Sequence, residues 1–298
     1  MDLTELPRLE GAQPLLSGLG LPEGPRWRDD RLWFSDLYKR RVMTVDLSGC
    51  AHVVAEFDDR PSGLGFLPDG TPIVVLMRTR RVMRILEGGA ELHADLSNMP
   101  GDHLNDMIVD ETGRAYVGVR RAPATHADPS IATELPDAVD AIVMVDVDGS
   151  VEVVAEDLIT PNGLAITGDG ERLVVAETRG RRITSFSISR PDGRLSDRSL
   201  IASTGDALPD GLCLDAEGGV WFGAPNRHAC VHITSSGTPN LMVDCKEKQV
   251  MACTRGGRGR KLLFLMTAVA TWDGHARGEA DGSIYYLEVA GPEGWGRP

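Results

Sequence analysis

A short tripeptide phrase recurs along this chain and constrains its fold more than any other feature. Five well-formed copies occupy residues 22–24, 61–63, 104–106, 161–163 and 209–211, and a degenerate sixth occupies residues 249–251. Most copies begin with Pro and end with Gly. The middle residues are Glu23, Ser62, Asn105, Asn162 and Asp210. A backbone feature that repeats, but presents a different oxygen-bearing side chain each time, is what a shared central site would need.

The copies follow one another at intervals of roughly 40–50 residues, with one longer interval, and such a period is typical of β-propeller blades with four short strands each. We therefore predict an all-β fold, a six-bladed β-propeller with a central metal site. Blades are expected to start near residues 22, 61, 104, 161, 209 and 249. We expect a single domain over residues 1–298, because all-β chains of this size are routinely one domain.

The residues between the repeated phrases read as strands. In the first blade, segments 22–27, 31–36, 41–46 and 51–57 are rich in Val, Phe and Trp and are separated by Asp or Gly turns. The last blade supplies only three strands, so we expect residues 13–17 to complete it and remove an exposed edge. No segment of convincing length carries a helical period.

Two irregular segments interrupt the pattern. Residues 120–139 are rich in Pro, Ala and Asp and account for the longer interval, and residues 267–281 separate the last two strands of the sixth blade. Long loops inside a compact repeat are usually functional or disordered. We expect the first segment to form a lid over one mouth of the channel.

The repeated phrase has a chemical interpretation. The innermost strand of each blade lines the central channel of a propeller, so the five middle side chains would point toward one axis. Carboxylate and amide oxygens suit a hard divalent cation, Ca²⁺, Mg²⁺ or Mn²⁺, better than a structural zinc ion. Each copy taken alone is more often a simple turn, and only the joint pattern favours a metal site.

Composition excludes several classes of partner. The formal net charge is −13, which argues against nucleic acid and against an anionic membrane surface, since both are bound through clustered Lys and Arg. There is no basic start followed by an apolar run and no apolar stretch long enough to span a membrane. The five scattered cysteines form no CxxC pair, which favours buried reduced thiols and a cytoplasmic location.

Other catalytic motifs are missing from the sequence. It contains no HExxH, no GxSxG and no phosphate-binding glycine loop between a strand and a helix. Among the seven histidines, His103 is the one that lies beside the proposed site, two residues before Asn105. A lone histidine is more often a packing or surface residue, but its titration range also suits a substrate contact.

The motifs together resemble the SMP-30/gluconolactonase/LRE family, also called the regucalcin family. The resemblance rests on PEGPRW at 22–27, LND at 104–106, PNGLAIT at 161–167, PDGLCLD at 209–215 and CTRGG at 253–257. It implies a six-bladed propeller with one divalent ion, in which Glu23, Asn162 and Asp210 are metal ligands and Asn105 holds either the metal or a substrate oxygen. Ca²⁺ is the expected ion, with Mg²⁺, Mn²⁺, Zn²⁺ and Fe²⁺ as alternatives.

The resemblance also implies hydrolysis of a lactone. Asp210 is the expected general base, or alternatively a nucleophile, while Asn105 and His103 are expected to bind the substrate. Two positions depart from the family's pattern: His103 replaces an arginine that often binds aldonolactones, and Arg120 and Arg121 occupy a region that is often acidic. The expected partner is therefore a small lactone or ester that need not be rich in hydroxyl groups.

Two other functions remain open. One is a metal-dependent esterase or phosphotriesterase that uses the same core, and the other is a non-catalytic propeller whose ion is structural. The sequence indicates no oligomeric state.

Overall fold

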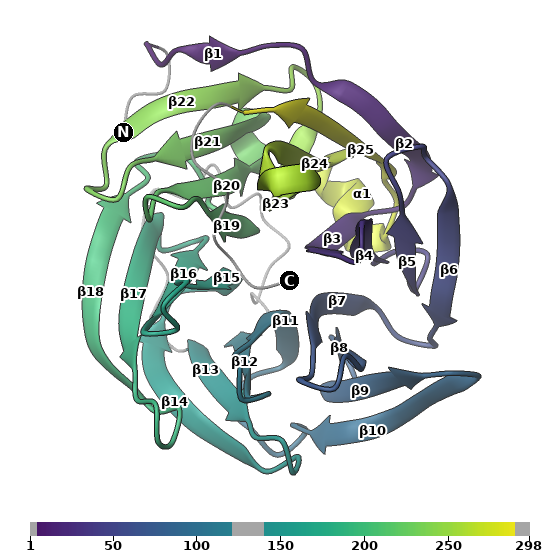
Figure 1. Ribbon diagram of the computed structural model, residues 1–298, viewed down its shortest axis with the longest axis vertical. Helices are drawn as coiled ribbons and strands as arrows, with labels where there is room; N and C mark the ends of the chain where they lie inside the picture. The colour runs from purple at the N-terminus through teal and green to yellow at the C-terminus, as the bar shows by residue number, and fades with distance from the viewer. Residues whose placement is uncertain (1–4, 121–139, 290–298) are drawn as a thin grey trace.

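The computed structural model describes residues 5–120 and 140–289, and in them six small sheets surround a central axis (Figure 1). Five sheets have four strands and one has five. Within each blade, consecutive strands pair in an antiparallel manner from the axis outward. The predicted all-β, six-bladed propeller is therefore confirmed, with inner strands starting close to the positions that the repeated phrase indicates.

The first three blades each run from an inner strand at the axis to an outer strand at the rim. The first blade contains β3 (Pro22–Arg28), β4 (Arg31–Asp36), β5 (Arg41–Val45) and β6 (Ala51–Glu56). The second contains β7 (Pro61–Phe66), β8 (Pro72–Leu76), β9 (Arg81–Leu86) and β10 (Gly89–Asp95). The third contains β11 (His103–Val109), β12 (Ala115–Arg120), β13 (Asp140–Val145) and β14 (Val151–Leu158).

The remaining blades follow the same order. The fourth contains β15 (Pro161–Ile166), β16 (Arg172–Glu177), β17 (Arg182–Ile188) and β18 (Leu195–Ser203). The fifth contains β19 (Leu212–Leu214), β20 (Val220–Ala224), β21 (Ala229–Ile233) and β22 (Pro239–Asp244). The sixth contains β23 (Gln249–Gly256), β24 (Leu262–Val269) and β25 (Asp281–Glu288). Two short 3-10 turns, η2 (Pro225–Arg227) and η3 (Arg258–Arg260), join neighbouring strands.

The N-terminal segment closes the ring. Strand β2 (Gln13–Leu19) pairs antiparallel with β25 and supplies the fourth strand of the sixth blade, as the sequence predicted. A further short strand, β1 (Arg8–Leu9), adds in parallel to the outer edge of β22. The two outer edges therefore gain partners from the start of the chain, which reduces the number of unpaired strand edges exposed to other molecules.

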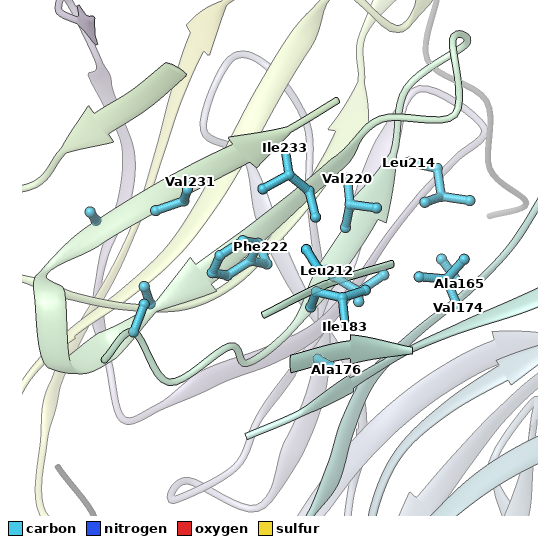
Figure 2. Close-up of a cluster of buried hydrophobic side chains, with 14 of the residues drawn as sticks. Ala165, Val174, Ala176, Ile183, Leu212, Leu214, Val220, Phe222, Val231 and Ile233 are labelled. Atoms are coloured by element: carbon cyan, nitrogen blue, oxygen red, sulfur yellow. The ribbon is translucent and has the colours of Figure 1, made fainter. Parts of the chain in front are cut away.

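The core lies between the faces of neighbouring blades. In a middle strand such as β13, every residue is buried, because the sheet packs against another sheet on both faces. Figure 2 shows one such layer, in which Val174 and Ile183 of the fourth blade pack with Leu212, Val220 and Phe222 of the fifth. Aromatic pairs join blades too: the Trp27 ring stacks on Phe264, with centroids 5.2 Å apart.

The glycine that ends the repeated phrase allows inner strands to approach closely. A methyl group on Gly63 would lie 2.2 Å from the backbone nitrogen of Met107, and one on Gly163 would lie 2.4 Å from the carbonyl oxygen of Asp210. Both distances are far inside van der Waals contact, so each glycine sets how tightly one blade packs on the next. The repeated phrase therefore has two roles: its glycine allows neighbouring blades to pack closely, and its middle residue presents a side-chain oxygen.

Some sequence-based expectations need correction. A six-residue helix, α1 (Trp272–Arg277), lies in the segment expected to be irregular; Thr271 caps its start and Gly278 ends it in the left-handed region, at φ 77°. Cys50 is exposed, although buried thiols were expected, because it follows a turn at the blade's outer side. All five cysteines are free thiols.

Two expectations are not tested by the structure. The expected lid at 120–139 lies outside the described residues except for Arg120. The cytoplasmic location stays a prediction. Among the described residues, no helix has the length and apolar character needed to cross a bilayer.

Candidate functional site

The predicted ligands lie at one end of the channel, where the inner strands begin. Glu23 is the second residue of β3, Asn105 the third of β11 and Asn162 the second of β15. Asp210 precedes β19, and its backbone nitrogen donates to the Gly223 carbonyl at 2.9 Å. Blades one, three, four and five therefore each contribute one of these side chains.

Two carboxylates far apart in sequence influence each other at this end of the channel. Burial raises the pKa of Glu23 well above its usual range, and the negative charges of Asp210 and Asp106 raise it further. Burial likewise raises the pKa of Asp210 to about 7, while the positive charge of Arg120 acts in the opposite direction. Carboxylates that stay charged in such surroundings need a nearby cation.

The two amides are held by hydrogen bonds to the fourth blade. Asn105 is buried, and its Nδ2 donates to the Pro161 carbonyl at 3.3 Å. Asn162 Nδ2 donates to Thr178 Oγ1 at 3.2 Å. Because the amide nitrogen is used in each case, the amide oxygen is the atom available to a metal ion or a substrate.

Ser62, the fifth middle residue of the phrase, has a different role. Its side chain is buried, and its carbonyl oxygen accepts a hydrogen bond from Ser35 Oγ at 2.7 Å. The carbonyl also lies against Gly24, where an added methyl group would come within 2.6 Å. Among the described residues, these contacts tie the first blade to the second, and none connects Ser62 to the carboxylates.

His103 lies at the rim of the channel mouth. It is the first residue of β11, pairs in register with Arg120 and is partly buried. Burial lowers its pKa below the usual value, and the charge of Arg120 lowers it further. A neutral imidazole is therefore expected at this position near pH 7.

Arg120 is a site residue that the sequence reasoning treated only as a departure from a pattern. Burial lowers the pKa of Arg120, while the charges of Asp210, Asp140 and Glu23 act in the opposite direction. Its Nε is buried and has no hydrogen-bond partner among the described residues. The sequence did signal this residue, because Arg120 and Arg121 stand where the family often has an acidic residue. That Arg120 lies near Asp210 and Glu23 follows only from the closure of the ring.

Asp106 and Arg26 form a buried pair beside the site. Arg26 Nη2 lies 3.5 Å from Asp106 Oδ1 and also donates to the Met107 carbonyl. The other Asp106 oxygen accepts from the Leu164 backbone nitrogen at 3.4 Å. Asp106 stands where the other well-formed copies of the phrase have glycine, and this departure was the signal that could have found it. The pair and the Leu164 contact together link blades one, three and four.

The donor set is compatible with a hard divalent ion. Asp210 Oδ1 is buried and has no hydrogen-bond partner among the described residues, so it is an oxygen with its lone pairs free. The other candidate donors are the Glu23 carboxylate and the amide oxygens of Asn105 and Asn162. In the described part of the chain there is no cluster of three or more His, Cys, Asp or Glu side chains suited to a metal. Any ion at this position would therefore depend on the two amides as well as the two carboxylates.

The architecture and the site define a class: a six-bladed propeller whose channel carries acidic and amide side chains at the starts of the inner strands. The model of the SMP-30/Gluconolactonase/LRE-like region matches residues 21–269 of the chain. The chain therefore belongs to this family, and the predicted family is confirmed.

Individual relatives agree with this membership. The chain is 27% identical over 288 residues to pentonolactonase XacC of Haloferax volcanii, with 93% of each chain covered. It is 24% identical to regucalcin of Danio rerio, with 85% of each chain covered. Among solved structures, a gluconolactonase from Xanthomonas campestris superposes with a TM-score of 0.73 at 23% identity, covering 97% of this chain and 96% of that one. At that identity, the superposition supports the fold alone.

Proposed function

We propose that this chain is a metal-dependent lactonase that opens a lactone by hydrolysis at the channel end formed by Glu23 and Asp210. The observation that carries the proposal is the meeting of two desolvated carboxylates, one with a buried oxygen that lacks a hydrogen-bond partner among the described residues. The named activity of one relative, pentonolactonase, supports the same reaction class.

The proposed metal ligands are Glu23, Asn105, Asn162 and Asp210. A bound divalent ion would supply Lewis-acid chemistry, by polarising a carbonyl group. Ca²⁺ is the proposed ion, because carboxylate and amide oxygens are the ligands that a hard divalent cation prefers. The chain's own residues supply positioning and proton transfer.

Asp210 is the proposed general base. Burial raises the pKa of Asp210 to about 7 in the chain without a cation. A bound divalent ion would lower that pKa, so the carboxylate would be ionised and able to accept a proton near neutral pH. In this role Asp210 takes a proton from the attacking water while Asn105 and His103 orient the lactone. A direct attack by the carboxylate is the alternative. A single turnover in ¹⁸O-labelled water distinguishes the two, because label incorporated into Asp210 would exclude the plain base role.

The test is a panel of lactones, carboxylic esters and phosphotriesters, assayed with the metal-loaded protein and after chelation. We expect lactones to be the best substrates and chelation to abolish turnover. Asp210→Asn is expected to lower kcat by about 10²–10⁴-fold, the usual contribution of a general base. Glu171→Gln, an exposed acid in the fourth blade, is the matched control and should retain full activity.

Each alternative predicts a distinct result. Preferred turnover of phosphotriesters or acyclic esters would assign the esterase function instead. A large metal-dependent rise in melting temperature, without turnover of any compound, would assign a structural ion. Turnover that persists after chelation would overturn metal dependence.

A further inference from the structure

Arginine side chains of the second and third blades lie at the same mouth as the proposed site. Arg60 immediately precedes β7, and its carbonyl oxygen accepts a hydrogen bond from the Met77 backbone nitrogen at 3.0 Å. Arg120 is the last residue of β12 and pairs with His103. Because each inner strand runs antiparallel to the second strand of its blade, the start of one and the end of the other lie at one end of the channel. Both arginines therefore share this mouth with Glu23.

The Arg120 side chain lies close enough to the proposed site for the charges there to act on it. Those charges come from Asp210, Asp140 and Glu23, and the Tyr38 hydroxyl group acts on it from the first blade. Its buried Nε has no hydrogen-bond partner in the described chain. A desolvated guanidinium with an unused N–H is a strong donor for an oxyanion.

Tyr38 lies near both arginines. The Arg60 guanidinium lies 4.9 Å from the centroid of the Tyr38 ring. Burial raises the pKa of the Tyr38 hydroxyl to about 12, while the charges of Arg60 and Arg120 act in the opposite direction. The Tyr38 hydroxyl is fixed by His275 Nδ1 at 3.0 Å, and His275 Nε2 lies 3.0 Å from Gln249 Oε1. This hydrogen-bonded chain links the first and sixth blades and keeps the ring in place as a platform for Arg60.

The carboxylate of Asp59, next to Arg60 in the sequence, is already occupied by hydrogen bonds. Asp59 accepts hydrogen bonds from the backbone nitrogens of Arg60, Arg78 and Thr79, at 2.7, 3.0 and 2.7 Å, and from the Thr79 hydroxyl at 2.9 Å. Four carboxylates act on the two guanidinium groups through their charges: Asp210, Asp140 and Glu23 on Arg120, and Asp59 on Arg60. The mouth thus offers two guanidinium groups, and the buried Nε of Arg120 has no hydrogen-bond partner in the described chain.

We propose that Arg60 and Arg120 form an oxyanion-binding subsite, and that the lactone hydrolysed at this site carries an anionic group, a carboxylate or a phosphate. The inference rests on the proposed lactonase function and specifies its substrate class. Guanidinium groups bind carboxylate and phosphate oxygens in a fixed, often bidentate geometry, which would orient the lactone ring over the carboxylates below. Binding at a group remote from the reacting carbonyl would also position that carbonyl.

The test compares three lactones that share one carbon skeleton. These are gluconolactone, which is neutral, its 6-phosphate, and glucarolactone, which has a carboxylate at the same end. The wild-type protein is expected to prefer one or both anionic lactones by about tenfold or more in kcat/KM, and raised ionic strength should weaken that preference. Comparing the 6-phosphate with glucarolactone shows whether the subsite accepts a phosphate, a carboxylate or both.

Variants assign the preference to the two arginines. In Arg60→Gln and Arg120→Gln, the ratio of kcat/KM for the preferred anionic lactone over gluconolactone should fall about tenfold. Arg190→Gln, an exposed arginine of the fourth blade that pairs with Glu171, should keep the wild-type ratio. An unchanged ratio in both site variants, or a wild-type preference for gluconolactone, would overturn the subsite and leave the lactonase function standing.

Ligand-induced shifts in melting temperature test the anion subsite separately from the proposed lactonase function. Glucarate has one more carboxylate than gluconate and should raise the melting temperature of the wild-type protein more than gluconate does. That difference should disappear in Arg60→Gln and Arg120→Gln. If no lactone is hydrolysed but the glucarate effect is present and lost in the variants, the subsite stands without the reaction. Equal effects of both acids would contradict the subsite.

Discussion

The carboxylates of Glu23 and Asp210 come from the first and fifth blades, and the charge of one raises the pKa of the other. Their proximity is costly in the absence of a cation, because like charges in a desolvated site repel. In chelated protein we therefore expect Glu23→Gln to have a higher melting temperature than the wild type. At an ion concentration a hundred times its Kd, the wild type should gain about 2.7 kcal/mol and the variant far less.

Thermal melts with and without Ca²⁺ test whether Glu23→Gln has the higher melting temperature without the ion and the wild type has the higher one with it. Glu171→Gln is the control, since its exposed carboxylate should leave both melting temperatures unchanged. A Glu23→Gln protein that responds to Ca²⁺ as strongly as the wild type would remove Glu23 from the ligand set.

The raised pKa of Asp210 predicts how the stability of chelated protein varies with pH. The folded-state pKa is about 7, against an ordinary value of 3.8, so between these values the folded chain binds more protons than the unfolded chain. The destabilising cost is absent below about pH 4 and grows as the pH rises to 7. Asp210→Asn removes this group. The melting temperature of the variant, measured relative to the wild type, should therefore rise between pH 5 and pH 8, and a constant difference would contradict the prediction.

The ring, and the end of the channel at which the candidate ligands lie, were predictable from the sequence because both follow from a period. The repeated phrase marks the start of each inner strand, and circular closure then brings Glu23, Asn105, Asn162 and Asp210 to one end of the channel. The fourth strand of the sixth blade was predicted in the same way, because that blade had three strands where each of the others had four. These predictions need only the number of blades, not the position of any side chain.

The surroundings of the ligands were not predictable in the same way. The pairing of Asp106 with Arg26 joins the third blade to the first, and the proximity of Arg120 to Asp210 joins the third to the fifth. Such contacts depend on side-chain directions across the channel, which no spacing encodes. The short helix α1 was missed since six residues carry too little periodicity, although its Thr cap and terminal Gly were visible.

The close approach at Gly163 predicts a substitution that harms the site more than the fold. A methyl group there would lie 2.4 Å from the Asp210 carbonyl oxygen and 2.5 Å from the Leu212 backbone nitrogen. Gly163→Ala must push the segment that carries Asp210 away, at a cost of about 1–3 kcal/mol for overpacking. We expect a fall in kcat larger than this loss of stability would explain at assay temperature, since the proposed base is displaced.

Urea unfolding and lactone turnover measure the two effects separately. Gly89→Ala is the matched control because a methyl group at Gly89 meets no atom within 4 Å. Wild-type turnover by folded Gly163→Ala protein would show that the position of Asp210 is not set by this contact.

The buried pair of Arg26 and Asp106 predicts that two substitutions of one ion pair will differ in their pH dependence. In Arg26→Met, Asp106 loses its positive partner, and a buried charge left unpaired costs about 3–5 kcal/mol. Burial already raises the pKa of Asp106 while Arg26 lowers it, so removing Arg26 raises it further. Protonation of Asp106 then removes the cost at low pH, so Arg26→Met should be destabilised strongly at pH 8 and less at pH 5.

In Asp106→Asn the remaining group is an arginine, which keeps its charge at both pH values, so no such recovery of stability is expected at pH 5. Urea midpoints of both variants at pH 5 and pH 8 measure the difference, with the exposed Arg190→Met as control, and an equal recovery in both variants would refute this account of the pair.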